Sequence, residues 1–379
     1  MPDDVPLQPP LQPWSLGENR VSRFYRGGAL LERFRGVPAD ECTDGDRPED
    51  WIGSTVRSWT LPGAPSTDEG LSRITTAGAE QTILSLLEAA PDVVAGRAFV
   101  ASVGRSTGVL VKLLDAANRL PTHLHPTRAF ARRHLGSFFG KAEAWIVLDV
   151  REIAGLEPPN VRLGFRRDVE RGELRHWIEA GESEPLLAAM HARPVHPGDV
   201  WFVPPGMPHA IGAGVFLVEV QEPTDFSIVL EVAGFPIDPG NANLGLGWDR
   251  AIEAVDRRGQ SDAAIDALRQ PSMPLDAGSG HARSALIGPA AAPFFRAERL
   301  SIRAPLAPAW GDTYVVGVVI GGSGRVRTAG GEIAVRAGST FAVPAAATAS
   351  LEIEPAGGDL VEIVACLPPP PDALASEVR

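Results

Sequence analysis

Three histidines and one glutamate are the residues of this chain whose types and spacing best support chemistry. They are His123, His125, Glu143 and His209, separated by 2, 18 and 66 positions. Side chains two residues apart on a strand share a face, so His123 and His125 should project together, while Glu143 and His209 arrive on later strands. Imidazole nitrogens and a carboxylate suit Zn, Fe, Mn, Co or Ni, and an open position lets the ion polarise a substrate oxygen. The spacing predicts a metal site without choosing the metal.

A shortage of lysine draws attention to Lys141. Lys112 and Lys141 are the only lysines among the 35 basic residues. Chance is one explanation, but lysine can lose its proton in a suitable pocket and arginine effectively cannot. Lys141 stands two positions before Glu143, so both side chains share a strand face. We expect a chemical role for this lysine beside the metal.

Composition limits the classes of partner. The 379 residues allow two domains, or one domain with a large insertion. A net charge of −12 and a pI of about 5.2 argue against nucleic acid or an anionic membrane as partner, so an anionic substrate needs a local basic pocket. Cys42 and Cys366 support neither a disulfide framework nor a cysteine metal site.

The remaining expectations about partners concern membranes and small molecules. The first residues, MPDDVPLQPPLQPW, lack the basic and apolar regions of a signal peptide, and no stretch reaches the length of a membrane span. We expect a cytoplasmic protein with a small-molecule partner, and the oligomeric state stays open.

The segments that must position the metal ligands have the pattern of β-strands. Four apolar runs lie between residues 108 and 230, namely GVLVKLLDA, KAEAWIVLDV, VWFVPPGMPHAI and GVFLVEVQEP, with prolines and glycines between them. Short strands at this density indicate a barrel or a sandwich. Residues 20–60 predict opening strands in RFYRGGALLERF and WIGSTVRSW, joined by a solvated loop.

Two further segments predict helices. Residues 68–95 carry Ile83, Leu84, Leu86 and Leu87 at helical spacing and end in Pro and Gly, which predicts a helical insertion. Residues 241–275 contain GWDRAIEAVDRRGQSDAAIDALRQ, an amphipathic stretch that ends at Pro271. This stretch is a plausible connector to a final domain.

An internal echo links two parts of the chain. GDVWFVPPGMPHAIGAG begins at Gly198, and GSTFAVPAAATASLEIE begins 140 residues later at Gly338 with Gly and Val-Pro aligned. Thr348 and Ala349 stand where the first copy has Pro208 and His209. The second copy is therefore predicted to keep the barrel framework and lack the metal ligand, although a coincidence of Gly and Pro turns is the alternative.

These residues carry a resemblance to a known family. The run from VLVKLLDA through LPTHLHP, GKAEAW and VPPGMPHAIGAGVFLVEVQEPTD resembles the metal-binding core of the class I mannose-6-phosphate isomerases, which are zinc-dependent cupin enzymes. The match is specific over residues 108–226. YRGGALLERF resembles the opening segment of the family, and PEDWIGST resembles its Glu-x-Trp segment near the sugar site.

The resemblance implies a mainly β fold of two cupin-like, jelly-roll β-barrels with a helical insertion and a helical connector. The predicted domains are a metal-binding barrel at 1–240, with the insertion near 68–95, the connector at 241–275, and a degenerate barrel at 276–379. The implied activity is the interconversion of mannose 6-phosphate and fructose 6-phosphate through a cis-enediol. The implied cofactor is Zn2+, with another divalent transition metal possible.

The resemblance also assigns roles position by position. Metal ligands in the family are a Gln and a His one residue apart, a Glu and a later His. His125, Glu143 and His209 match directly, and His123 occupies the glutamine position with an additional nitrogen donor. Lys141 matches a family lysine that is a candidate for proton transfer. The acidic segment after the last histidine supplies a second catalytic candidate, Glu219, and the substrate-binding candidates are Glu49, Trp51, Lys112, Asp225 and Arg128.

The chain departs from the family at one important position. Family members carry an arginine shortly after the Asp that corresponds to Asp225, where it acts in catalysis or charge stabilisation. Here TDFSIVLEVAGF offers Val229 or its neighbours, and no basic residue follows before Arg250. The candidates for a substitute cation are Arg57, Arg128, Arg132 and Arg133.

Aldose–ketose exchange requires a base that removes a proton next to the carbonyl and a group that stabilises the charge of the resulting enediol. The predicted site has residues for both tasks, with Trp51 and Trp145 as possible walls for the sugar. Two rivals stay open. One is another metal-dependent cupin enzyme, such as an oxygenase or an isomerase of an unphosphorylated sugar, and the other is a non-catalytic sugar-binding relative.

Overall fold

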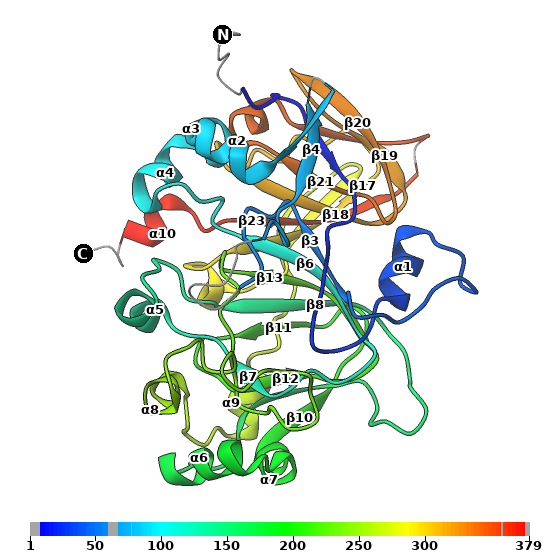
Figure 1. The fold of residues 1–379 in the computed structure, drawn as a ribbon. Coiled ribbons are helices and arrows are strands. Elements are labelled where there is room, and N and C mark those ends of the chain that lie inside the picture. Colours follow the sequence, from blue (N-terminus) through cyan, green and yellow to red (C-terminus); the bar gives the residue numbers. More distant parts are fainter. Residues whose placement is uncertain (1–7, 60–66, 77, 358, 376–379) are drawn as a thin grey trace.

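Two antiparallel β-barrels stack against each other along most of their length (Figure 1). The structure is a computed structural model and describes residues 8–59, 67–76, 78–357 and 359–375. Strands outnumber helices throughout, and the mainly β prediction with two barrels is confirmed. No helix in these ranges is long and apolar enough to cross a membrane.

The first barrel consists of a six-stranded and a five-stranded sheet. The six-stranded sheet has the order β11-β8-β13-β6-β3-β2, and the five-stranded sheet has the order β10-β9-β12-β7-β14. The strand bounds are β2 (Arg20–Val21), β3 (Glu49–Ile52), β6 (Leu110–Ala116), β7 (His123–Leu124), β8 (Glu143–Val150), β9 (Asn160–Phe165), β10 (Met190–Pro194), β11 (Val200–Val203), β12 (His209–Ile211), β13 (Val215–Gln221) and β14 (Ile228–Val229).

The apolar runs predicted as strands include the central strands of this barrel, where both faces of a strand are buried. Every residue of β13 is buried. Leu217 packs with the cluster inside the first barrel, whereas its neighbours Phe216 and Val218 pack with residues of the second barrel. Alternation along a strand therefore points Glu219 into the first barrel as well.

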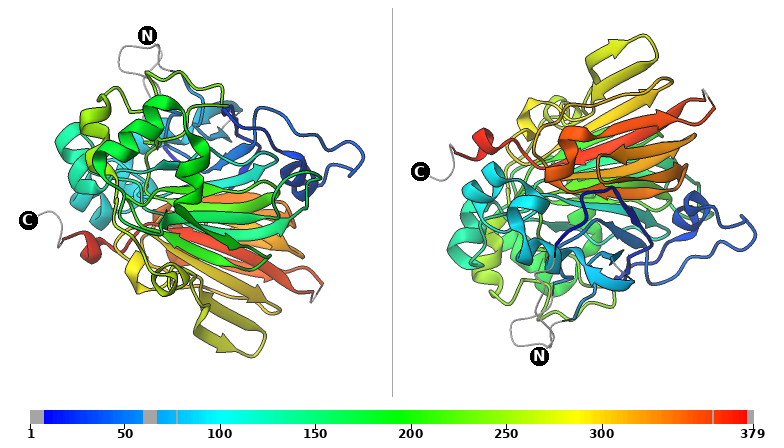
Figure 2. Two further views of the ribbon diagram at one scale, coloured as in Figure 1. Left: turned by 90° about the horizontal axis from the view of Figure 1, so that it is seen from below. Right: turned by 90° about the horizontal axis from the view of Figure 1, so that it is seen from above.

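The second barrel consists of a seven-stranded sheet with the order β1-β21-β18-β23-β17-β16-β15 and a three-stranded sheet with the order β20-β19-β22. Figure 2 shows its sheets beside those of the first barrel. The bounds are β1 (Trp14–Leu16), β15 (Met273–Gly278), β16 (His281–Ala285), β17 (Arg296–Ile302), β18 (Val315–Gly321), β19 (Ser323–Thr328), β20 (Gly331–Arg336), β21 (Thr340–Val343), β22 (Glu352–Pro355) and β23 (Val361–Leu367).

The N-terminal strand β1 crosses the predicted domain boundary. It pairs with β21, with Trp14 opposite Ala342, although its residues were assigned to the first domain. One continuous apolar cluster also joins the two barrels and contains both Val218 and Val318. The start of the chain thus belongs to the sheet of the second barrel, because strand pairing and not sequence order sets sheet membership.

The helical insertion begins later than predicted. Strands β4 (Arg73–Thr76) and β5 (Ala79–Thr82) pair with each other where a helix was expected, since threonines favour strands and Gly78 takes a positive φ before β5. Thr82 then accepts a hydrogen bond from the backbone N–H of Ser85 and caps the first helix. The helices are α2 (Ile83–Ala89), α3 (Pro91–Ala95) and α4 (Arg97–Val103).

The opening segment is also a helix where a strand was predicted. Helix α1 spans Ala29–Arg35. One carboxylate oxygen of Asp115, on β6, accepts hydrogen bonds from the backbone N–H groups of Gly28 and Leu30 at 2.9 and 2.7 Å. A carboxylate at this end stabilises a helix, and it comes from a residue far along the chain.

The predicted connector contains only short helices. They are α8 (Trp248–Ala251), η1 (Ile252–Ala254) and α9 (Asp262–Asp266). Between them Gly259 bridges to Phe165, and a Cβ atom at Gly259 would lie 2.7 Å from the Cα of Arg167. Because of this close approach, the segment does not form the continuous helix that the amphipathic pattern predicted. The other helices are α5 (Arg128–His134), α6 (Arg171–Ala180), α7 (Ser183–Ala188), η2 (Pro289–Ala291), η3 (Ala345–Ser350) and α10 (Pro371–Ala375).

Candidate active site

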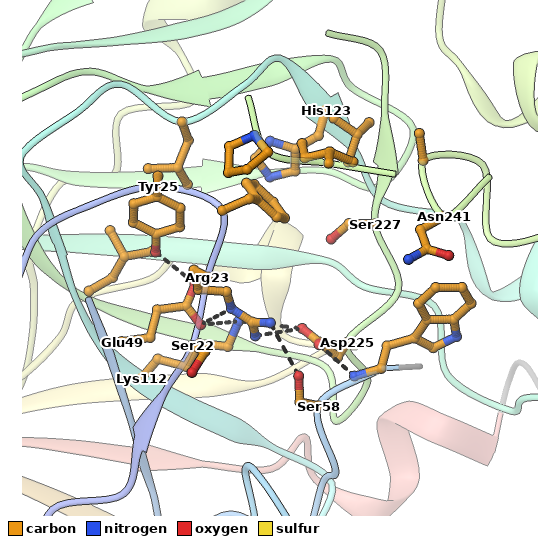
Figure 3. Close-up of a pocket in the computed structure, with 18 of the residues that line it drawn as sticks. Ser22, Arg23, Tyr25, Glu49, Ser58, Lys112, His123, Asp225, Ser227 and Asn241 are labelled. Atoms are coloured by element: carbon orange, nitrogen blue, oxygen red, sulfur yellow. Dashed lines mark hydrogen bonds and ion pairs between the residues drawn. The ribbon is translucent and has the colours of Figure 1, made fainter. Parts of the chain in front are cut away.

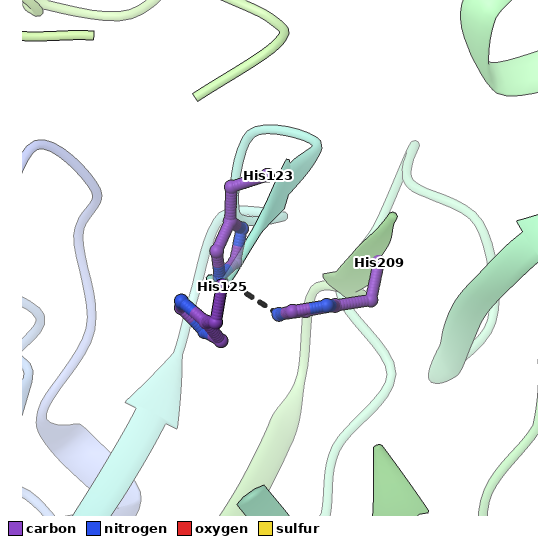
Figure 4. Close-up of side chains that lie close together, drawn as sticks. All are labelled: His123, His125 and His209. Carbon is purple, nitrogen blue, oxygen red and sulfur yellow. Dashed lines mark hydrogen bonds between the residues drawn. The ribbon is translucent and has the colours of Figure 1, made fainter. Parts of the chain in front are cut away.

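The four predicted metal ligands converge inside the first barrel. β12 and β7 pair with His209 opposite His123, and the Nε2 atoms of these two residues lie 3.1 Å apart. The Nε2 atom of His125 lies 2.9 Å from Oε2 of Glu143, and that of His209 lies 3.3 Å from Oε1. All four side chains are buried. Figure 4 shows the three imidazoles facing one another.

Each histidine is held in the tautomer that a metal requires. The Nδ1 atoms of His123, His125 and His209 lie 2.8, 2.7 and 2.8 Å from the backbone carbonyls of Pro121, Phe226 and Met207. A carbonyl can only accept, so Nδ1 carries the proton and the Nε2 lone pair points into the site. The donor set therefore fits a divalent transition metal.

The charge states also suit metal binding. Burial lowers the pKa of His123, as does His209, and burial with the charge of Lys141 lowers the pKa of His125 to about 3. Burial alone would raise the pKa of Glu143, but the charge of Lys141 acts against it, and that pKa lies well below its usual range. Neutral imidazoles and an ionised carboxylate are the forms that coordinate metals.

Lys141 lies beside these donors, as its spacing from Glu143 predicted. Its Nζ atom is 2.7 Å from Nε2 of His125 and 2.9 Å from Oε2 of Glu143. The Nε2 atom of a neutral histidine has one lone pair, so His125 cannot accept from Lys141 and bind a metal at the same time. Lys141 therefore forms hydrogen bonds with the same atoms of His125 and Glu143 that would bind a metal.

A cavity of about 510 Å³ opens next to the histidines (Figure 3). Strand register explains part of its lining, because Lys112 lies between Trp51 on β3 and Glu219 on β13 as a direct cross-strand neighbour of both. Cross-strand neighbours place their side chains on one face of the sheet. The polar side chains among its lining residues are Ser22, Arg23, Tyr25, Glu49, Ser58, Lys112, His123, Lys141, Glu219, Asp225, Ser227, Asp238 and Asn241.

The floor of the cavity is a network of alternating charges. The Nζ atom of Lys112 lies 3.0 Å from Glu219, 3.5 Å from Glu49 and 3.9 Å from Asp225. It also lies 4.8 Å from the ring centre of Trp51. Burial by itself would lower the pKa of Lys112, but these carboxylates raise it above its usual range, so the lysine stays charged.

The two glutamates of this network differ in their proton affinity. Burial raises the pKa of Glu49, but the opposing effects of Arg23 and Lys112 are larger and hold it well below its usual range. Burial raises the pKa of Glu219, and Lys112 only partly opposes this. Of these two glutamates, Glu219 is thus the one that gains a proton more readily, a property of general acids.

The structure separates the candidate residues into two groups. Lys141, Glu219, Glu49, Lys112 and Asp225 line the cavity. Trp51 lies beneath it with its Nε1–H donating to Glu49, and Trp145 is fully buried and donates to Glu143 at 3.0 Å.

Arg128 is not a residue of this cavity. It is buried, its Nε donates to Glu222 at 2.5 Å, and its Nη2 donates to the carbonyl of Pro293 at 2.8 Å. Arg57 pairs with Asp68 instead, and the guanidinium of Arg132 lies over Phe138. The buried partners of Arg128 lie on other segments, which its position in the sequence could not reveal.

Two residues that contact the carboxylates of this network were not predicted from the sequence. Arg23 contacts Glu49 and Asp225, and the hydroxyl of Tyr25 donates to Glu49 at 2.7 Å. One signal was present, since Arg23 directly precedes the aromatic residues Phe24 and Tyr25 and stands two positions after Val21, which is unusual company for a solvated arginine.

Comparison with known proteins shows what the chain and its fold are similar to. No family model matches the chain. Over 242 residues, 64% of this chain and 70% of the relative, it is 28% identical to the Bacillus subtilis protein named "Probable mannose-6-phosphate isomerase GmuF". Over 117 residues, 31% of this chain and 34% of the relative, it is 36% identical to the mannose-6-phosphate isomerase of Streptococcus mutans.

Solved structures show the same fold over nearly the whole chain. The mannose 6-phosphate isomerase from Bacillus subtilis superposes with a TM-score of 0.68 and 20% identity, covering 93% of this chain and 99% of that one. A phosphomannose isomerase from Salmonella typhimurium gives a TM-score of 0.65 and 14% identity, covering 94% and 99%.

The fold and the four convergent donors define a cupin protein with a candidate metal centre. Its relatives by sequence and its neighbours by structure are mannose-6-phosphate isomerases, so the chain is a homologue of these cupin-fold enzymes. The resemblance predicted from the sequence is confirmed.

Proposed function

We propose that the protein is a metal-dependent aldose–ketose isomerase that interconverts mannose 6-phosphate and fructose 6-phosphate. One observation carries the proposal: the four donors His123, His125, Glu143 and His209 meet beside Lys141 at the wall of a polar cavity large enough for a sugar. The relatives described above carry the same activity in their names.

We assign zinc as the metal, held by these four side chains, because three imidazoles and a carboxylate suit it. A bound divalent ion would supply polarisation of substrate oxygens. The protein's own residues divide the remaining work. Lys141 Nζ takes or returns the proton that moves between the two carbons of the substrate, and Glu219 holds or releases a proton at its carboxyl group. Glu49, Lys112 and Asp225 bind sugar hydroxyls.

The test of this proposal is Lys141→Ala, compared with Lys141→Arg. Alanine removes the group that transfers the proton, and arginine restores a charge that cannot be given up at neutral pH. We expect neither variant to exchange the C2 proton of mannose 6-phosphate with solvent, while each keeps the wild-type metal content by elemental analysis. A fully active alanine variant would reject the role of Lys141.

An isomerase of an unphosphorylated sugar is the second candidate, and one observation favours it. Each cation that lines the cavity within the described residues, namely Arg23, Lys112 and Lys141, already contacts a carboxylate. A phosphate dianion would therefore compete with these carboxylates. Turnover of free mannose that equals or exceeds turnover of mannose 6-phosphate would support this candidate.

A further inference from the structure

Arg23 brings a guanidinium to the centre of the cavity from the segment after β2. Its Nε lies 2.9 Å from Oε2 of Glu49, and its Nη2 donates to Asp225 at 3.1 Å. Its Nη1 donates to Ser58 at 3.3 Å, and the group lies 5.0 Å from the ring centre of Trp51. Figure 3 shows this guanidinium between the carboxylates.

The guanidinium keeps hydrogen-bonding capacity that the protein does not use. An arginine side chain has five N–H groups, and each Nη atom carries two of them. Ser58 and Asp225 each take one, and neither Nη atom has another acceptor in the described parts of the chain. The side chain is only 12% exposed and lines the cavity, so a ligand there is the natural partner for the remaining N–H groups.

No other arginine lines this cavity among the residues that the structure describes. Val229, which stands near the position where an arginine was expected after Asp225, lines the same cavity with an apolar side chain. It pairs in register with His123 on β7, so β14 contributes no charge at this point. Arg23 instead delivers a guanidinium to Asp225 from 202 residues away in the sequence.

We propose that Arg23 is a substrate-binding residue whose unused N–H groups bind oxygen atoms of the sugar substrate, with Glu49 and Asp225 fixing the guanidinium. A planar guanidinium held on two sides is pre-organised, so little side-chain entropy is lost on binding. This inference rests on the proposed isomerase function.

Arg35 offers a matched control on the other face of the same strand. Glu49 and Asp50 are consecutive residues of β3, so their side chains point to opposite faces. Arg35 pairs with Asp50 and donates to the carbonyl of Gly338 at 3.0 Å, and neither Arg35 nor Asp50 lines the cavity. Both arginines are thus largely buried and paired with a carboxylate of one strand, but only Arg23 faces the cavity.

The experiment compares Arg23→Ala and Arg35→Ala in the metal-loaded enzyme with mannose 6-phosphate and with mannose. We expect Arg23→Ala to lower kcat/KM roughly 10- to 100-fold, the range for a lost hydrogen bond to a charged group. Millimolar guanidinium chloride should restore part of this loss, because the free cation can enter the vacated position, whereas sodium chloride should not. Arg35→Ala should lower the thermal midpoint but keep kcat/KM, without a response to guanidinium.

The outcomes separate the inference from the function on which it rests. A loss confined to mannose 6-phosphate assigns the contact to the phosphate, and an equal loss with both sugars assigns it to an oxygen that they share. Unchanged kcat/KM in Arg23→Ala overturns the inference, and so does a loss that guanidinium does not restore. If the wild type turns over neither sugar, the isomerase function fails, and calorimetric binding of mannose 6-phosphate to wild type and Arg23→Ala then decides the role of Arg23.

Discussion

The two barrels contain a repeated segment, and only the copy in the first barrel carries the histidine His209. In the first barrel Gly198 leads into β11, and the chain continues through Pro204 to His209 on β12. In the second barrel Gly338 leads into β21, which begins and ends 140 residues after β11, and the chain then forms η3 before β22, which pairs with β19 as β12 pairs with β9. The echo seen in the sequence is therefore a structural repeat, in which η3 separates the proline from the strand that corresponds to β12.

The interiors of the barrels differ in the same way. The interior of the second barrel is packed mainly with apolar side chains, including Val319, Phe341 and Ile363, and among the described residues its buried polar side chains, such as Glu298 and Thr328, include no histidine or lysine. The first barrel has an apolar cluster at one part of its interior and buried histidines, carboxylates and a lysine at another. The same strand framework thus accommodates either a mainly apolar interior or one that includes buried charged side chains and histidines. We propose that function in the first barrel depends on these few polar residues and that the second barrel contributes packing.

The largest expected effect comes from moving the histidine between the repeats. His209→Ala should abolish isomerase activity and metal binding, because it removes one of four donors. Ala349→His places a histidine 140 residues after His209, at a position that is exposed on η3 and lies outside the barrel interior, and should add no second metal. Elemental analysis of both variants checks this. A second metal equivalent in Ala349→His would contradict the comparison.

The next effect concerns the apolar filling of the second barrel. Phe341 is fully buried, and its ring packs directly over Gly317, whose added Cβ atom would lie 2.1 Å from the ring. Phe341→Ala should lower the free energy of unfolding by about 3–5 kcal/mol. Denaturant unfolding measures this change. Metal content and kcat of the folded fraction should stay at wild-type values, and their loss would show that the second barrel does more than pack.

A smaller effect is expected at η3, the helical turn that precedes β22. The hydroxyl of Thr348 is directed at two backbone carbonyls, those of Gly311 and Ala345, at 2.5 and 2.6 Å. Thr348→Val keeps the shape and leaves these carbonyls without the hydroxyl, which should cost about 1–3 kcal/mol. Thermal unfolding of this variant beside Thr348→Ser checks the value, since serine keeps the hydroxyl. Equal losses in both variants would point to packing instead.

The smallest effect is a pH dependence of the charged network in the first barrel. The pKa of Glu49 is lower in the folded protein than its unfolded value of about 4.3, so its stabilising contribution is complete above that value and declines as the pH falls. The stability difference between wild type and Glu49→Gln should be constant between about pH 7 and 5.5 and should narrow below about pH 4. Unfolding curves at each pH measure it, and a difference that grows toward acid pH would reverse the assigned sign.

Much of the site could be predicted because strand geometry is local. A period of two residues placed His123 with His125 and Lys141 with Glu143, and the structure brings all four together. The helix α1 could not be predicted in this way, since its first N–H groups are bound by Asp115 on a distant strand. The pairing of β4 with β5 differs from the prediction for another reason, because the turn at Gly78 prevailed over the helical pattern of this segment.

The sequence by itself determined the donor set, the strand-rich framework and the repeat that lacks a ligand, because each of these depends on residue type and short spacing. Only the tertiary structure decided which carboxylate each buried arginine meets. Arg128, a candidate for the sugar site, pairs with Glu222 outside the cavity, and Arg23, which no motif marked, pairs with Asp225 within it. The physical reason is that a buried charge needs a partner in space, and chain packing brings that partner from any distance in the sequence.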